Sequence, residues 1–550
     1  MSNLINTAMT GINAASAALS TTSNNISNYS VAGYSRQTTV LAQASSTLNG
    51  TQYYGNGVSV ASVNREYDAF ITNQLRSATT QSSALTTQYS QLSSLNNMFA
   101  STTNTLSTTM QSFFSSLQTL TSNASDSSSR QAVLGKADGL VNQFKVTDTY
   151  LRNVDSSLNT SIGSSVDQIN GYAKQIANIN QQITKLKGAG AGNEPNDLMD
   201  QRDQLVSDLN KIVGVTVSQQ DGGSYNISIG NGTSLVLGDS YSKLAAVASS
   251  ADPSRTTIAT VDSTTKATTE IPEKLITTGS LGGLLASRTD LDNTRNQLGQ
   301  MAMALGDSFN TQHEAGYDSN GDAGEAFFNM GGPTVTANSN NSTGVSVSAA
   351  WTDTSKVQAS DYKVSYDGSS WSVKRLSDNA TVTPTAGTDA SGNSTLSFDG
   401  LQLTVSGTPS TKDSFTVKPV SNVISSMSVN ITDEAKIAAA DADNGVSNNN
   451  NAQSLLDLQT KKVITGDSTL TQGYASMVAT IGNKTSNLET TSTTQGNVVT
   501  QLTSQQQSVS GVNLDEEYGN LTRYQQYYTA NAQILQTATT IFNALIGAVS

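Results

Sequence analysis

The sequence predicts a multidomain α+β protein. Its N- and C-terminal helices are expected to pair as a coiled coil, with an elongated helical-bundle domain and outer β-rich domains inserted between helices. Three observations lead to this prediction. The chain has 550 residues, which is enough for several domains of ordinary size. Apolar residues recur at every seventh position in separate blocks. Between these blocks apolar and polar residues alternate, as they do in strands.

Each end of the chain carries a heptad series of apolar residues. The series are Ile5, Ile12, Leu19 and Ile26 near the N-terminus, and Leu514, Leu521, Tyr528, Leu535 and Phe542 near the C-terminus. Sustained sevenfold spacing favours near-parallel helices that pack side by side. We therefore expect the two terminal helices to pair, and we expect these residues to pack in the assembled state.

Four further heptad blocks lie inside the chain. They span residues 85–120, 162–186, 284–305 and 474–509. A heptad that continues over several turns predicts a long helix, so we expect one helix for each block. A shorter helix is expected to begin near Pro195.

Two regions between the helical blocks are expected to be rich in β-strands. Alternating segments flank Asp-Gly pairs that begin at Asp221, Asp367 and Asp399. An Asp-Gly pair between two alternating segments is a strong signal for a hairpin.

These patterns divide the chain into four units. The expected boundaries are 1–40 with 510–550 for the terminal coiled coil, 41–210 with 279–331 and 426–509 for a helical rod-like domain, 211–278 for a β-rich insertion, and 332–425 for an outer β-rich domain.

The composition argues against several classes of partner. Charged residues make up 13% of the chain, against about 25% in ordinary soluble domains, and the formal net charge is −13. Nucleic acids and anionic membranes both need a concentrated basic face, so we expect neither as a partner. A surface with few charges suits contacts between identical copies, because such contacts place like charges side by side.

Export and redox signals are also informative. The chain has no cysteine, which excludes disulfides and thiolate metal sites. Residues 1–35 contain no basic residue and scatter their apolar residues, unlike a secretory signal peptide. If the protein is exported, we expect a route that does not cleave this N-terminus. No run of residues is apolar enough to predict a transmembrane helix.

Two candidate metal motifs are incomplete. His313 is the single histidine, and Tyr317 stands where an HExxH zinc motif needs its second histidine. Residues 318–324 resemble a calcium loop in part, but Ala323 and Asn329 replace the glycine and the bidentate glutamate that such a loop requires. We expect a tight turn here rather than a metal site.

Three carboxylates lie on one face of the helix after Pro195. Asp197, Asp200 and Asp203 are spaced by three residues, and paired carboxylates can perform acid–base chemistry. Nothing in the sequence indicates that they are buried, so we expect a solvated or ion-paired helix face. We therefore predict a structural protein, with no catalytic, metal or cofactor site.

The stretch from Ser23 to Gln37 carries a specific motif. It contains Asn24, Asn25 and Asn28, followed by Gly33, Tyr34 and Arg36. This pattern resembles the N-terminal signature of the bacterial flagellar rod and hook family. The pattern alone leaves rod, hook and junction proteins open.

Further motifs narrow the resemblance to the family of flagellar hook-associated protein 1, the hook–filament junction proteins. These motifs are Arg65 with Tyr67, Asp68 and Phe70, the helix at 196–209, the residues from Phe309 to Phe328, and the segment 510–535. The similarity covers nearly the full length and is loosest in the β-rich insertions.

The resemblance implies an inner tube of paired terminal helices with β domains outermost. It implies self-assembly into a homo-oligomeric ring or helical lattice, with hook protein on one side and the next hook-associated junction protein, then flagellin, on the other. It also implies type III export to the outside of the cell, with a chaperone on the C-terminal helix until assembly. The alternatives are another axial protein of the family, such as hook or distal rod protein, or a secreted adhesin-like surface protein.

Arg36 is the only charged residue among the first 64. We expect the uncharged helix before it to be buried among copies, and the three asparagines to end that helix by competing for its backbone hydrogen bonds. Gly33 would then allow a turn. Arg36 is expected to be the first charge to reach water or an acceptor on a neighbouring subunit.

Overall fold

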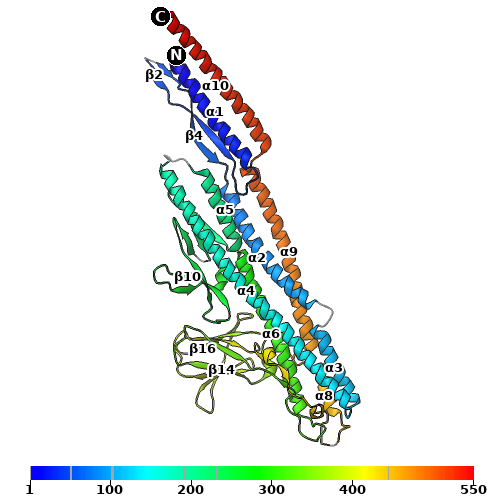
Figure 1. Cartoon of the computed structure of the whole chain (residues 1–550). Helices are drawn as coiled ribbons and strands as arrows, with labels where there is room; N and C mark the ends of the chain where they lie inside the picture. The colour runs from blue at the N-terminus through cyan, green and yellow to red at the C-terminus, as the bar shows by residue number, and fades with distance from the viewer. Residues whose placement is uncertain are drawn as a thin grey trace.

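The computed structural model describes residues 2–49, 52–100, 105–189, 194–230, 232–443 and 445–549. The molecule is elongated, and both termini lie at one end of it (Figure 1). Long helices run along its length, and the β-rich domains lie against one side of them (Figure 1). Among the described residues, no helix combines the length and the apolarity that crossing a bilayer requires.

Each heptad block lies within one helix, with one exception. The helices are α1 (Ser2–Asn28), α2 (Ala69–Phe99), α3 (Leu106–Ser122), α4 (Ser127–Ala189), α5 (Asn196–Ile212), α6 (Gly279–Glu314), α7 (Val423–Ser426), α8 (Asn450–Asp457), α9 (Leu470–Ser510) and α10 (Leu514–Val549). α4 begins well before its block, and α7 and α8 lie outside the blocks. Short 3₁₀ helices occupy Glu273–Leu275, Thr354–Lys356 and Glu434–Lys436. The helices between α1 and α10 form the shaft of the molecule, in which α2 packs against α6 and α9, and α4 packs against α3, α5 and α6.

The exception is the block at 85–120, where the prediction of a single helix is wrong. α2 ends at Phe99, and α3 begins at Leu106 with the Thr105 side chain accepting a hydrogen bond from the Thr108 N–H. The sequence from Ser101 to Thr105 is rich in Ser, Thr and Asn, which favour caps and turns over helix interiors. Residues 101–104 themselves lie outside the described part of the chain.

In the described residues, the two predicted β-rich regions contain four sheets. The first region holds β5 (Val215–Gln219), β6 (Tyr225–Ile229), β7 (Thr233–Leu237) and β8 (Ser240–Tyr241) in one sheet, and β9 (Leu244–Ala248), β10 (Thr256–Val261) and β11 (Thr268–Glu270) in another. The outer region holds a five-stranded sheet of order β13-β21-β15-β16-β17 and a four-stranded sheet of order β14-β20-β19-β18.

The strands of the outer region are β13 (Thr334–Ala337), β14 (Ser346–Trp351), β15 (Tyr362–Tyr366), β16 (Trp371–Arg375), β17 (Thr381–Val382), β18 (Thr385–Thr388), β19 (Ser394–Phe398), β20 (Leu401–Ser406) and β21 (Ser414–Lys418). A short pair, β12 (Phe328–Asn329) with β22 (Ser428–Val429), lies beside it in sequence. The three Asp-Gly hairpins are confirmed, since β5 pairs with β6, β15 with β16, and β19 with β20.

Residues 37–65 form strands that the sequence reading did not anticipate. They are β1 (Gln37–Gln43), β2 (Thr47–Asn49), β3 (Gln52–Tyr54) and β4 (Val58–Arg65), and β1 pairs with β4 and β2 with β3. The boundary expected at residue 41 therefore falls inside β1, and the helical segment begins only at α2. The missed signals are the Thr and Val residues and the Asn-Gly pairs that begin at Asn49 and Asn56.

The terminal helices pair, as predicted, but the most buried residues of α1 are small or polar rather than the heptad residues. The buried face of α1 consists of Ala8, Ala14, Ala15, Ala18, Thr21, Thr22 and Asn25. The heptad residues Ile5, Ile12, Leu19 and Ile26 are half-buried, as are Leu514, Leu521 and Leu535 on α10. Tyr528 and Phe542 are each 43% exposed. Small side chains let two helices approach closely, which leaves the larger apolar residues at the edges of the contact.

His313 is a core residue near the end of α6. It is fully buried, its Nδ1–H donates to the Glu325 carbonyl oxygen at 2.6 Å, and its Nε2 accepts from the Ala438 N–H at 2.9 Å. Burial lowers the pKa of the imidazole to about 4. The Asp318 carboxylate, where a calcium loop had been considered, accepts from the N–H groups of Asn320 and Asp322 as a turn.

This buried imidazole predicts an acid-sensitive core. Between pH 6.5 and about 4 the unfolded chain binds a proton that the folded chain does not, so the free energy of unfolding falls as pH falls through this window. The loss from this residue reaches about 3 kcal/mol. His313→Gln keeps a donor and an acceptor but does not titrate. Urea unfolding at pH 7 and 4.5 should show a smaller acid loss for the variant; equal losses would contradict the assignment.

Candidate functional site: the joint between the terminal helices and the helical domain

The terminal helices meet the helical domain at a joint, by which we mean residues 24–37, 65–76, 196–204 and 510–517. In Figure 1 this is the region where α1 ends and α9 passes into α10. The chain leaves α1, turns through residues 29–36 and enters β1, while β4 returns to the same region. All six motif residues from Asn24 to Arg36 therefore lie in the joint.

Asn25 is the centre of the joint and is 1% exposed. Its Nδ2 donates to the Gln37 carbonyl oxygen at 2.9 Å and to Glu517 Oε2 at 3.1 Å. Its Oδ1 accepts from the Tyr34 hydroxyl at 2.9 Å and from the Gln37 N–H at 3.0 Å. An amide side chain has two donor hydrogens and two acceptor lone pairs, so Asn25 is fully used. It joins the end of α1 to both β1 and α10.

Arg36 binds the first turn of α10 in its own chain. Its Nε donates to Glu517 Oε1 at 2.8 Å, and its Nη1 donates to Glu516 Oε2 at 2.7 Å. The side chain of Glu517 is 2% exposed, whereas that of Glu516 is 57% exposed. Arg36 was expected to reach water or an acceptor on a neighbouring subunit; its side chain is 21% exposed, and the single chain already supplies two acceptors because α10 begins beside the end of α1.

α5 anchors the joint to the helical domain through two buried carboxylates. Asp200 accepts from the Ser35 N–H at 3.1 Å and from Arg65 Nη1 at 2.7 Å. Asp203 accepts from the same Arg65 nitrogen at 3.1 Å and from Arg76 Nη2 at 3.0 Å. The predicted ion pairing of this helix face is confirmed, but these two carboxylates are buried rather than solvated because the joint covers them.

The first turn of α5 also holds both strands of the β1–β4 pair at one end of the ladder. Gln37 Nε2, at the start of β1, donates to Asp197 Oδ1 at 3.2 Å. Asn196 Nδ2 donates to the carbonyl oxygen of Val63, near the end of β4, at 2.8 Å. The two strands are thereby fixed to α5 as well as to α1.

Another arginine fixes α5 on its other side. Arg202 is fully buried, with its guanidinium 3.4 Å from the centre of the Tyr225 ring. Its Nη1 donates to Asn180 Oδ1 at 3.1 Å and to the Gly223 carbonyl oxygen at 2.6 Å. α5 is thus held against α4 and the first β insertion, which gives the joint a rigid base.

The turn that follows α1 depends on Gly33. The predicted role of the asparagines, to end the helix by competing for its hydrogen bonds, is seen at Asn28. Asn28 Nδ2 donates to the Asn24 carbonyl oxygen at 3.0 Å, which is the expected competition for helix hydrogen bonds. Asn25 has the different role described above. Gly33 has a φ of +82°, and a Cβ there would lie 2.7 Å from Gln204 Oε1. The turn therefore needs both a left-handed backbone and a small residue.

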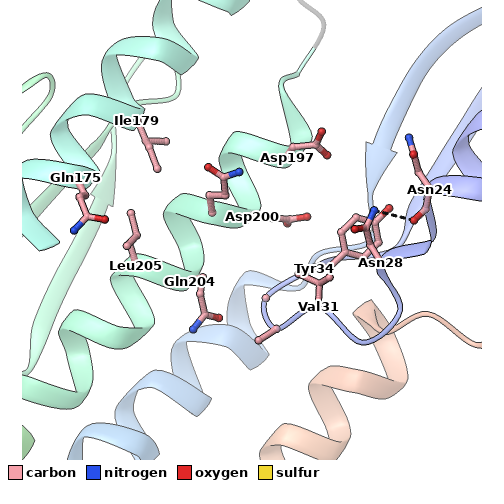
Figure 2. Close-up of a pocket in the computed structure, with 13 residues that line it drawn as sticks. Asn24, Asn28, Val31, Tyr34, Gln175, Ile179, Asp197, Asp200, Gln204 and Leu205 are labelled. Atoms are coloured by element: carbon pink, nitrogen blue, oxygen red, sulfur yellow. Dashed lines mark hydrogen bonds between the residues drawn. The ribbon is translucent and has the colours of Figure 1, made fainter. Parts of the chain in front are cut away.

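A pocket of about 540 Å³ opens between this turn and the helices beneath it. Figure 2 shows Asp197, Asp200 and Gln204 of α5 along one side, with the turn that carries Val31 and Tyr34 opposite them. The lining is mainly amide, carboxylate and aliphatic, and the Asp200 carboxylate is already bonded to Ser35 and Arg65. These groups offer no nucleophile with an adjacent base, so the pocket lacks the pairing that acyl or phosphoryl transfer requires.

Burial also sets the protonation of the joint. It raises the pKa of Tyr34 to about 12, with added contributions from nearby carboxylates, so the Tyr34 hydroxyl remains a donor to Asn25. Burial raises the pKa of Asp200, while Arg65 and the Ser35 N–H oppose that change. The arrangement positions two helices rather than moving protons.

Comparison with known proteins identifies the family. Family models match residues 5–34 ("Flagella basal body rod protein"), 92–328 ("Flagellar hook-associated protein FlgK helical domain"), 336–419 ("Flagellar hook-associated protein 1, D2-like domain") and 504–548 ("Flagellar basal body rod FlgEFG protein C-terminal"). Flagellar hook-associated protein 1 of Escherichia coli (strain K12) is 61% identical over 549 residues, which cover 99% of this chain and 100% of the relative. The chain belongs to the flagellar hook-associated protein 1 family.

Two further comparisons agree. Flagellar hook-associated protein 1 of Salmonella typhimurium is 60% identical over 555 residues, covering 99% of this chain and all of the relative. The solved structure of the flagellar hook junction protein FlgK from Burkholderia pseudomallei matches with a TM-score of 0.75 at 29% identity, and the match covers 80% of this chain and 100% of that one. The predicted family and fold class are confirmed.

Sequence reasoning missed several residues that form the joint in this member of the hook-associated protein 1 family. It assigned no pairing to Glu517, Arg65 or Arg76, and it expected no burial at Asp200 and Asp203. One signal was available: a lone arginine in a long uncharged segment needs an acceptor, and the acidic run Asp515–Glu517 is the charged part of the helix expected to lie beside it.

The unequal burial of the two glutamates predicts unequal effects. Glu517→Ala leaves the buried Asn25 amide and Arg36 short of an acceptor and should destabilise the joint by about 2 kcal/mol. Amide exchange across residues 24–37 should then be roughly 30-fold faster, since 1.4 kcal/mol is a factor of ten. Glu516→Ala, the matched control, should change exchange less than threefold. Equal effects of the two substitutions would show that burial of Glu517 is not what holds the joint.

Gly33 gives a second prediction for the joint. Gly33→Ala should destabilise it by about 1–2 kcal/mol, because alanine must adopt a positive φ and push against Gln204. Gly171→Ala is the control, since that glycine lies inside α4 with open space around it, and there alanine should stabilise by up to about 1 kcal/mol. Local amide exchange or limited proteolysis near residue 30 would measure the difference. Gly33→Ala behaving like Gly171→Ala would refute the conformational requirement.

Proposed function

We propose that this chain is a structural subunit of the bacterial flagellum whose copies self-assemble into the junction between hook and filament. In this role it has no active site, and its work is mechanical: it joins two tubes with different lattices. The carrying observation is the row of apolar residues on α10 that stays exposed in the single chain and lies in the part of the helix that has no charge, beyond Arg523.

α10 is 36 residues long, or about 54 Å at 1.5 Å per residue. One side packs on α1. Along one edge of this contact Tyr527, Ile534 and Ile541 follow one another at intervals of seven and are 53%, 43% and 47% exposed. We call these three residues the outer stripe. A long exposed apolar stripe marks a binding surface rather than a surface meant for water.

The lack of charge in α1 and in α10 beyond Arg523 supports a self-assembly role. No charged residue precedes Arg36 or follows Arg523. In a ring of identical subunits any exposed charge faces its own copy, so a tube wall built from these helices must be nearly neutral. The heptad residues that are only half-buried or exposed in one chain, such as Leu535 and Phe542, become buried when copies pack.

The proposal also includes an export chaperone, an export route and neighbouring proteins in the flagellum. Before assembly, the apolar surface of α10 needs cover, which suits an export chaperone bound to the C-terminal helix. Export through the flagellar type III apparatus would place the subunit outside the cell. The proposed neighbours are hook protein on one side, and the next hook-associated junction protein followed by flagellin on the other.

The alternatives have less support. The matches to basal-body rod proteins are confined to residues 5–34 and 504–548, whereas the long middle of the chain matches hook-associated proteins, which argues against a hook or distal rod protein. An adhesin-like surface protein would use its β domains for binding and would not need the exposed apolar row on α10.

A charge on α10 tests the proposal. Phe542→Asp should abolish filaments and motility, because assembly would bury an unpaired carboxylate in every subunit, at a cost of several kcal/mol each. Phe542 is exposed in the single chain, so the free energy of unfolding of the monomer should change by less than about 0.5 kcal/mol.

Tyr241→Asp is the matched control. Tyr241 is 41% exposed, close to the 43% of Phe542, but it lies on β8 in the first β insertion. This variant should swim and carry normal filaments. Electron microscopy of the cells and assay of unassembled subunit in the medium would distinguish failed assembly from failed export. Normal filaments in the Phe542→Asp strain would disprove the proposed role of α10.

A further inference from the structure

The strands between α1 and α2 form an apolar ribbon with no assigned role. We define the ribbon as residues 37–64, which contain β1 to β4. Exposed apolar side chains lie opposite each other in its cross-strand pairs: Leu41 (44% exposed) with Val60 (39%), and Leu48 (55%) with Tyr53 (74%). The ribbon contains no charged residue at all. An apolar surface of this extent without charge is a candidate interface.

The ribbon is also a weak structure on its own. Each of its two sheets has only two strands, so within the described residues every strand of the ribbon pairs with one neighbour and leaves its other edge open. A two-stranded sheet is marginally stable in water, and proteins normally protect an open edge with charges or cover. The ribbon has no such charges, which indicates that something covers it in the working state.

The ribbon and α10 lie on different sides of α1. On one side, the Thr10 hydroxyl lies 3.4 Å from the Val58 N–H and accepts its hydrogen bond, and the Thr39 hydroxyl donates to Thr21 at 2.9 Å. On another side, a Cβ on Gly11 would meet the Asn531 side chain of α10. Figure 1 shows α1 between the ribbon strands β2 and β4 and the helix α10. The terminal unit thus exposes apolar residues on two separate flanks.

Two different flanks suit a head-to-tail contact between copies. A two-fold contact would join one flank to itself and would end at a dimer, whereas a contact between unlike flanks continues and closes into a ring or forms a helix. Both flanks are uncharged, so their union costs no like-charge repulsion within a chain of net charge −13. The apolar pairs of the ribbon and the outer stripe offer each other matching chemistry.

We propose that the ribbon of one copy packs against the outer stripe of α10 in the next copy. This inference rests on the proposed function, since it concerns how the assembled copies touch. It gives the ribbon the role of covering the part of α10 that α1 leaves open, and it gives α10 the role of supporting the weak ribbon. Leu41 and Val60 on one copy then lie against Ile534 and Ile541 on its neighbour.

The cysteine-free sequence makes this contact directly testable. Cells that express Leu41→Cys and Ile534→Cys chains together would be treated with a short bis-maleimide after flagella have assembled. Mixed flagella should yield a cross-linked dimer of twice the chain mass, and flagella with either variant alone should yield none. A second pair, Val60→Cys with Ile541→Cys, tests the same contact at another point, in case the cysteines of the first pair lie too far apart for the cross-linker.

Controls separate this inference from the proposed function. Ser391→Cys, on a loop of the outer β domain, should give no dimer when mixed with Ile534→Cys. Dimers from Leu41→Cys alone would show that ribbon meets ribbon, and intact motile flagella without dimers in either mixed pair would show that the flanks do not meet; both outcomes overturn the inference and leave the proposed function standing. Absence of the chain from the hook–filament junction would instead overturn the proposed function.

Discussion

The buried carboxylate of Glu517 is the constraint on which the terminal part of the molecule depends. A carboxylate with 2% exposure costs several kcal/mol unless it is paired and hydrogen-bonded. Its partners, Arg36 and Asn25, come from the other end of the chain. Because a guanidinium and an amide have fixed donor directions, the end of α1 and the start of α10 can meet in one relative position only. The pairing of the two helices beyond this point follows from it.

The carboxylates of α5 transmit that constraint to the rest of the molecule. Asp200 binds the backbone of Ser35 and the side chain of Arg65, which stand at the two ends of the segment that forms the ribbon. Asp203 adds Arg76 from α2. The terminal helices, the ribbon and the helical shaft are therefore linked by hydrogen bonds to charged groups, which are stronger than those between neutral groups. A joint of this kind resists bending between the terminal helices and the helical shaft.

The sequence predicted the parts of the fold that local periodicity determines. Heptads located the long helices, and Asp-Gly pairs located the hairpins, because both signals depend on residues that are near neighbours in the chain. It failed where distant segments decide the outcome. The burial of Asp200 depends on a turn more than 160 residues earlier in the chain, and the acceptors of Arg36 lie more than 470 residues later. The joint was visible as a motif from Asn24 to Arg36, but its partners could not be read from spacing.

The small size of the most buried residues of α1 has a consequence for the proposed assembly. If isoleucine and leucine formed the centre of the contact between α1 and α10, each subunit would use its strongest apolar surface internally and would have little left to bind a neighbour. Ala14 and Ala18 are buried instead, while Ile534 and Ile541 remain exposed. The large apolar residues at the edges of the pair thus remain available for other contacts. Under the proposed self-assembly, the terminal helices gain most of their apolar burial only when copies come together.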